Sequence, residues 1–405
     1  MASDVPSGWC GIERSALRIV GRCDARAALR EVRAPPHALA MRLPIPLRSA
    51  LAAALLAGGC TRPVPAPQGP APQAQPAAPQ AEAPAPAAPA PEPSQRPALD
   101  EFDRQVLFKQ LVDLSFHTQL GGEMVVRKVQ YAGADDMIIP AYLFAPRDTG
   151  RSYPAVIMVH GGVHGDFDDV YVPQVRSLVR RGYVVVAPEY RGSTGYGRAF
   201  YDAIDYGGKE VEDAVAAVDY LAKLVPYADT TRMGIMGWSH GGFITLHAIF
   251  RRPELFKVAV AHVPVADLPS RIRSHSPAYH RLFARQQGFG GPLEARREKY
   301  VERSPIAHAR KLRTPLLVHA ASNDDDVFIE ENHNLRDSMV AAGMQANGLY
   351  TYREWTDPPG GHAFNRVDTP QARESWAETV AFLDRRLRPE LRSVGGPPRA
   401  NGRRP

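Results

Sequence analysis

The chain has 405 residues and a net charge of +6, and much of its excess arginine lies in the first 60 residues and in the segment 388–405. No Lys/Arg run with interleaved aromatic residues occurs between these ends, so the charge does not indicate a nucleic acid as a partner. The 3 cysteines are Cys10, Cys23 and Cys60, which excludes a cysteine nucleophile and a cysteine-based zinc site from the segment after residue 60.

A segment with the anatomy of an export signal begins at Met41. Arg42 and Arg48 form a positive region, an apolar run follows at 50–57, and small residues precede Cys60. The apolar run is too short to span a membrane. The Gly-Gly-Cys end resembles a bacterial lipoprotein signal, in which the cysteine is lipidated and becomes the first residue of the mature chain, and an ordinary secretory signal is the alternative.

From this pattern we expect residues 1–40 to precede the true translation start and residues 41–60 to be a lipoprotein-type signal peptide. The protein would then be exported, either as a lipoprotein anchored to a membrane only through Cys60 or as a periplasmic or extracellular protein.

Composition also divides the rest of the chain. Residues 61–97 are almost only Pro, Ala, Gln and Glu, so we expect an extended, disordered linker there. Residues 98–388 mix apolar runs with turn residues and are enough for one large domain with a buried core. A short disordered tail is expected at 389–405.

Within the domain, apolar segments at 125–130 and 138–144 flank a polar turn and predict a β-hairpin. Further short strands are expected at 155–159, 183–187, 232–236, 258–261, 315–319 and 349–352. Helices are expected at 172–181, 211–224, 242–250, 330–342 and 372–386. This alternation predicts an α/β fold, with a mostly parallel sheet that has helices on both faces. The segment 267–310 interrupts the alternation and is expected to form a helical insertion near the site described next.

The pentapeptide Gly237-Trp238-Ser239-His240-Gly241 fits the pattern Gly-x-Ser-x-Gly. A predicted strand precedes it and a predicted helix follows it, which is the context of a sharp turn that presents a nucleophilic serine. Glycine is needed on both sides because a Cβ would clash in such a turn. The start of the helix would stabilise negative charge at Ser239. We therefore predict an α/β-hydrolase fold with Ser239 as the nucleophile.

A serine nucleophile requires a base within hydrogen-bond reach and a carboxylate that orients this base. In α/β-hydrolases the order along the chain is Ser, Asp or Glu, then His, each on a loop after a strand. His362 is the only histidine after the last predicted strand, so it is the predicted base. The preceding loop carries Asp324, Asp325 and Asp326. One of them should face His362 and the others solvent, because crowding three carboxylates would raise their pKa values.

An oxyanion hole requires two backbone N–H groups aimed at the developing charge. One is expected from His240, whose ring cannot usually turn back onto the neighbouring serine. The other is expected from Gly162 in the stretch His160-Gly161-Gly162, because glycine lets the backbone approach the substrate, and a plain tight turn is the alternative. His160 and His164 lack further ligands at recognisable spacing, so His160 should pack at the strand end. Neither a metal nor a cofactor is predicted.

Five motifs occur within residues 152–387, at the stretches 160–162, 190–197, 237–242, 304–306 and 361–364. Their residues and their order resemble the catalytic domain of the prolyl oligopeptidase family, especially its acylaminoacyl-peptidase and dipeptidyl-peptidase-like branches. In this family the acid commonly lies three residues before the valine of Asp-Asp-x-Val, so the resemblance selects Asp324 ahead of Val327. The family usually has an N-terminal β-propeller, and the segment between the linker and the first core strand is too short to form one.

The resemblance implies a serine hydrolase that cleaves peptide or acyl-amide bonds through an acyl-enzyme on Ser239, with a small peptide, acyl-amide or ester as substrate. A carboxylesterase with the same triad is the first alternative. A non-catalytic binding lipoprotein on a hydrolase scaffold is the second. Its mark would be the loss of Ser239, Asp324 or His362, and the sequence retains all three.

Overall fold

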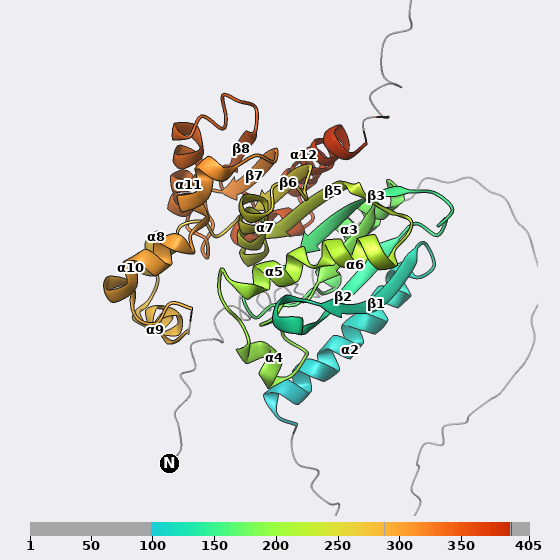
Figure 1. Cartoon of the computed structure of the whole chain (residues 1–405), viewed down its shortest axis with the longest axis horizontal. Coiled ribbons are helices and arrows are strands. Elements are labelled where there is room, and N and C mark those ends of the chain that lie inside the picture. Colours follow the sequence, from blue (N-terminus) through green and yellow to red (C-terminus); the bar gives the residue numbers. More distant parts are fainter. Residues whose placement is uncertain (1–98, 287, 389, 391–405) are drawn as a thin grey trace, which may run out of the picture. The chain divides into compact units, whose positions relative to one another are not determined.

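The computed structural model describes residues 99–286, 288–388 and 390 (Figure 1). Several predicted segments lie outside these residues: residues 1–40 before the expected translation start, the signal peptide with Cys60, the linker and nearly all of the tail.

An 8-stranded sheet forms the centre of the described fold, with the strand order β1-β2-β4-β3-β5-β6-β7-β8. The strands are β1 Val125–Ala132, β2 Ile138–Ala145, β3 Tyr153–Val159, β4 Val184–Pro188, β5 Ala228–Trp238, β6 Val258–His262, β7 Leu316–Ala321 and β8 Tyr350–Trp355. β2 pairs antiparallel with β1 and with β4, and all other neighbours are parallel. The predicted hairpin and the mostly parallel sheet are therefore confirmed.

The order of the strands reverses at β3. The chain runs from β3 to β4 on one side and then crosses to β5 on the other side. In open parallel sheets such a reversal leaves a crevice at the carboxyl ends of the strands, and ligands bind there. The loops that follow β3, β5, β7 and β8 all leave the sheet at this edge, because these strands are parallel.

Helices cover both faces of the sheet, as predicted, because each central strand is apolar on both sides. The α-helices are α2 Glu101–Leu120, α3 Val172–Arg180, α4 Arg198–Asp202, α5 Lys209–Val215, α6 Ala217–Leu224, α7 His240–Arg251, α8 Leu268–Ser274, α9 Pro277–Arg285, α10 Leu293–Glu302, α11 Ile329–Ala341 and α12 Pro370–Leu387. On one face α2, α3 and α12 share a buried cluster with the sheet, and on the other face α5, α6, α7 and α11 do so.

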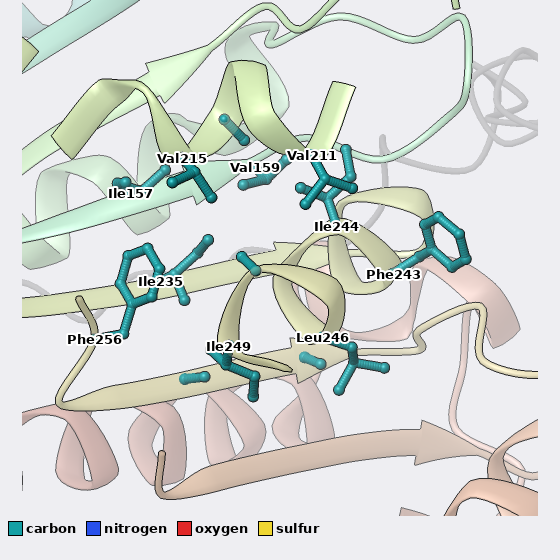
Figure 2. Packing of buried hydrophobic residues seen from close by; sticks show 14 of the residues in the cluster. Ile157, Val159, Val211, Val215, Ile235, Phe243, Ile244, Leu246, Ile249 and Phe256 are labelled. Carbon is teal, nitrogen blue, oxygen red and sulfur yellow. The ribbon is translucent and has the colours of Figure 1, made fainter. Parts of the chain in front are cut away.

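The residues of β3 alternate between these two clusters. Ile157 and Val159 pack with α5 and α7, whereas Val156 and Met158 pack on the opposite face. Figure 2 shows the first of these clusters, in which Ile157 lies among side chains of β5, α5 and α7. β3, which lies next to β5 in the sheet, is thus buried on both faces.

The predicted helical insertion consists of α8, α9, α10 and the 3₁₀ helix η4 (Pro305–Lys311), shown in orange in Figure 1. Its aromatic residues connect it to the region beside the nucleophile. The Phe283 ring lies 4.8 Å from that of Tyr206, and the Tyr206 ring lies 4.5 Å from that of His240. The insertion therefore forms one side of the site.

The helices differ from the sequence prediction at three places. The predicted helix 211–224 is divided at Ala216 into α5 and α6, and neither α2 nor the short α4 was predicted. α2 packs Val112, Phe116 and Leu120 against the sheet. The buried Lys109 of α2 contacts Glu189 at the end of β4, and its Nζ lies 2.8 Å from Asp166 Oδ2.

Candidate active site

Ser239 occupies the turn between β5 and α7, as the sequence pattern predicts. Its φ of 54° and ψ of −117° are unusual for a residue with a side chain, and its exposed fraction is 5%. A Cβ on Gly237 would lie 2.3 Å from the carbonyl oxygen of Gly241, and a Cβ on Gly241 would lie 2.3 Å from that of Val159. Gly237 is therefore required for the turn to close onto the start of α7, and Gly241 is required for it to pack against β3.

His362 and Asp324 meet at the carboxyl ends of β8 and β7. His362 lies in the 3₁₀ helix η5 (Gly361–Arg366), and its Nδ1 is 2.8 Å from Asp324 Oδ2. The other oxygen of Asp324 accepts the backbone N–H groups of Asp326 and Val327 at 3.0 and 2.8 Å. These bonds fix the Asp324 carboxylate, so it can hold the proton of His362 on Nδ1 and leave Nε2 to act as the base.

The other two aspartates of the loop have different environments. Asp325 is exposed, as expected, but the expectation that Asp326 also faces solvent is wrong. Asp326 Oδ1 accepts a hydrogen bond from Arg271 Nη2 at 2.8 Å, and Asp326 Oδ2 lies 3.4 Å from His362 Nε2. Arg271 of α8 supplies a positive charge beside Asp326, which offsets the repulsion between the carboxylates of Asp324 and Asp326.

The charges around Asp326 keep it ionised. Burial would raise the pKa of its carboxyl, but the charge of Arg271, the nearby ring of His275 and the charge of His362 hold this pKa well below its usual range. No hydrogen bond joins Ser239 Oγ to another residue in the part of the chain that the structure describes. Asp326 is a polar group on the Nε2 side of His362.

Two backbone N–H groups are available beside the nucleophile. Gly162 has a φ of 80°, and Tyr190 donates a hydrogen bond from its hydroxyl to the Gly162 carbonyl. The N–H of Gly161 donates to Tyr171 Oη at 3.1 Å, whereas the N–H groups of Gly162 and His240 have no partner among residues 99–286 and 288–388. The N–H of His240 is free because it belongs to the first turn of α7. This arrangement suits an oxyanion hole.

The ring of His240 packs into the interior, away from an acid–base role. Its Nε2 lies 3.6 Å from Glu210 Oε1, and the ring contacts Tyr206 edge-on. Burial lowers the pKa of His240, and the nearby Glu210 only partly opposes this effect. The backbone of His240 is thus the part that reaches the site.

The stretch 190–197 holds the oxyanion loop in place, a role that the sequence did not reveal. His160 is fully buried, stacks on Tyr190 with ring centres 4.3 Å apart, and its Nε2 lies 2.9 Å from Ser193 Oγ. It therefore packs at the strand end, as predicted. Arg191 donates to both carboxylate oxygens of the buried Asp213, at 2.7 and 2.8 Å. No local pattern marks Asp213 as the partner, because the contact joins α5 to the loop after β4.

Comparison with known proteins agrees with this geometry. The family model described as the prolyl oligopeptidase family matches residues 170–390. The chain belongs to the prolyl oligopeptidase family. The match includes the whole nucleophile turn and the loops of Asp324 and His362, and it begins after the loop of Gly162.

Relatives of the chain include an uncharacterized peptidase, YuxL, of Bacillus subtilis, which is 30% identical over 62% of this chain and 37% of its own length. Dipeptidyl aminopeptidase BIII of Pseudoxanthomonas mexicana is 30% identical over 66% of this chain and 39% of its own length. The acylamino-acid-releasing enzyme of Sus scrofa is 31% identical over 63% of this chain and 34% of its own length. The chain thus spans well under half the length of these relatives.

Solved structures of similar proteins share this fold. A puromycin-hydrolyzing peptidase of Mycobacterium tuberculosis has a TM-score of 0.55 and 28% identity, over 65% of this chain and 39% of that one. An acylaminoacyl peptidase in complex with a chloromethyl ketone has a TM-score of 0.57 and 21% identity, over 65% of this chain and 42% of that one. The second comparison supports the α/β-hydrolase fold alone.

Proposed function

We propose that the protein is a serine-type peptidase that cleaves peptide or acyl-amide bonds through an acyl-enzyme on Ser239. The observation that carries the proposal is the 2.8 Å contact between His362 Nδ1 and Asp324 Oδ2, at the same sheet edge as the strained Ser239 turn. A buried, hydrogen-bonded carboxylate on the distal nitrogen of a histidine is the arrangement that activates a serine.

In the proposed first step, Ser239 Oγ attacks the carbonyl carbon of the substrate while His362 Nε2 takes the hydroxyl proton. Asp324 stabilises the imidazolium that results and keeps its ring oriented. The negative charge that develops on the carbonyl oxygen is stabilised by the N–H groups of Gly162 and His240, which require no rearrangement because Tyr190 and α7 already hold them.

In the proposed second step, the tetrahedral intermediate collapses and the leaving amine receives the proton from His362 Nε2. The acyl group remains on Ser239 Oγ. A water molecule then loses a proton to His362 and attacks the acyl carbon, and Ser239 recovers its proton as the acid product departs. Each step uses the same base, the same carboxylate and the same pair of N–H groups.

The proposed substrates are short peptides or N-acylated amino-acid amides. Support comes from the relatives, whose names describe dipeptidyl and acylamino-acid-releasing activities.

A substrate panel tests the proposal. Purified protein is assayed with dipeptidyl, aminoacyl and N-acyl-aminoacyl arylamides and with short-chain aryl esters, and Ser239→Ala serves as the blank. We expect arylamide hydrolysis by the wild type that the variant lacks. Hydrolysis of esters alone would contradict the proposed peptidase activity and support a carboxylesterase. No hydrolysis of either class would favour a non-catalytic binding protein.

A further inference from the structure

A second carboxylate borders the proposed base. Asp324 contacts Nδ1 of His362, and Asp326 Oδ2 lies 3.4 Å from Nε2 of the same ring. Nε2 is the nitrogen that must exchange a proton with Ser239 in the proposed mechanism. The imidazole therefore has one carboxylate on each nitrogen.

Asp326 is held in this place by the helical insertion. Arg271 of α8 donates from Nη2 to Asp326 Oδ1 at 2.8 Å and from Nη1 to the backbone carbonyl of Asp326 at 2.9 Å. The Arg271 side chain is only 5% exposed and that of Asp326 is 31% exposed. Two donors from one buried guanidinium fix both the loop and the carboxylate, which leaves Oδ2 to face His362.

We propose that Asp326 is a positioning residue for the base, and that it stabilises the protonated form of His362 from the Nε2 side. This inference rests on the proposed function, because it concerns the protonation of His362 during that reaction. When the ring is neutral and its proton is on Nδ1, the lone pair of Nε2 gains nothing from a carboxylate, so Nε2 is available to the hydroxyl of Ser239.

When His362 has taken the proton of Ser239, its Nε2–H faces an anion. Asp326 then stabilises the same imidazolium that Asp324 stabilises on the other side. No atom is gained or lost in this exchange, since the proton moves from Ser239 Oγ to Nε2 and later to the leaving amine.

Other charged groups lie around the pair. His275 Nε2 of α8 is 3.9 Å from Asp326 Oδ1, and Glu331 of α11 and Tyr279 of α9 both contact Arg271. Burial raises the pKa of Glu331 to about 7, against the charge of Arg271. Glu331 accepts from Nη1 of Arg271, whereas the Asp326 carboxylate accepts from Nη2. The Glu331 contact does not involve the Asp326 carboxylate, so its titration should affect the wild type and an Asp326 variant alike.

The test is the pH profile of kcat/KM for Asp326→Asn on an uncharged arylamide. Asparagine keeps the size of the side chain, and its amide oxygen can still accept from Arg271. Because an anion beside Nε2 favours the protonated ring, removing it should move the acid limb of the profile to lower pH. One charge at 3.4 Å in a water-like medium corresponds to a shift of about 1 pH unit.

Asp325→Asn is the matched control. It also removes one carboxylate charge, but from the exposed side chain of the neighbouring residue. Its acid limb should coincide with that of the wild type. Should Asp326→Asn fail to fold, as judged by thermal unfolding, Asp326→Ser removes the charge with a smaller side chain and should give the same shift.

An unshifted acid limb in a folded Asp326 variant, or equal shifts in the Asp325 and Asp326 variants, would overturn the inference. A lower rate with an unchanged profile would do so as well, because it indicates a purely structural role. A wild type that hydrolyses no substrate would instead contradict the proposed function, so the two failures are distinguishable.

Discussion

At the scale of single residues, Asp324 decides the orientation of the proposed base. Asp324→Asn should lower kcat by about 10³- to 10⁴-fold, because an amide cannot hold the Nδ1–H tautomer and cannot stabilise the imidazolium. Steady-state kinetics on the best substrate of the panel measure the loss. Asp325→Asn, with its exposed side chain, should stay close to the wild-type rate. Equal, small losses in both variants would place the acid elsewhere.

The sequence predicted some of the site residues better than others. Ser239 and His362 follow from a local pattern and from their order along the chain, which a single sequence displays. Among the three aspartates, the choice of Asp324 came from the resemblance to the family. The expectation that Asp326 faces solvent failed because its partner, Arg271, lies on α8, and no spacing in the sequence connects the two.

At the scale of elements, α2 is attached to the sheet by a buried charge. Lys109 is 2% exposed and contacts Glu189, which is fully buried. Burial would raise the pKa of Glu189, but Lys109 and then His160 hold it below its usual value. His160 Nε2 lies 3.4 Å from Glu189 Oε2, so this group also borders the loop of Gly162.

Lys109→Met should therefore destabilise the fold, because it leaves Glu189 buried without its main partner. Breaking a buried pair in this way costs roughly 3 to 5 kcal/mol. Denaturant unfolding measures the change in the free energy of unfolding. Lys128→Met is the matched control, since the pair of Lys128 with Asp113 is partly exposed and contributes about 0 to 1 kcal/mol. Similar losses in both variants would argue against an anchoring role for Lys109.

α2 shows why some elements could not be predicted. Its inner side carries Val112 and Phe116, whereas Phe108, Leu111 and Leu114 are 57%, 64% and 63% exposed on its outer side. Apolar residues on both sides remove the stripe that marks an amphipathic helix. The central strands and α7, in contrast, were predictable because their apolar runs are short, buried and bounded by turn residues.

At the scale of the whole molecule, no helix of residues 99–286 or 288–388 is both long and apolar enough to cross a membrane. We propose from the sequence that export depends on residues 41–60 and that acylation of Cys60 provides the only anchor. Cys60→Ser should then move the protein from the membrane to the soluble fraction without changing its activity on a soluble ester. Fractionation with mass spectrometry of the N-terminal peptide measures this. An uncut chain that continues through Cys60 would contradict the proposal.

The central claim is that Ser239 is an activated nucleophile, and covalent labelling tests it without knowledge of the substrate. A fluorophosphonate probe reacts with serines whose hydroxyl is activated by a base, and mass spectrometry of the digested protein locates the adduct. We predict one adduct on the peptide that contains Ser239, with no labelling of Ser239→Ala and greatly slowed labelling of His362→Ala. Labelling at another residue, or an unlabelled wild type that is folded, would contradict it.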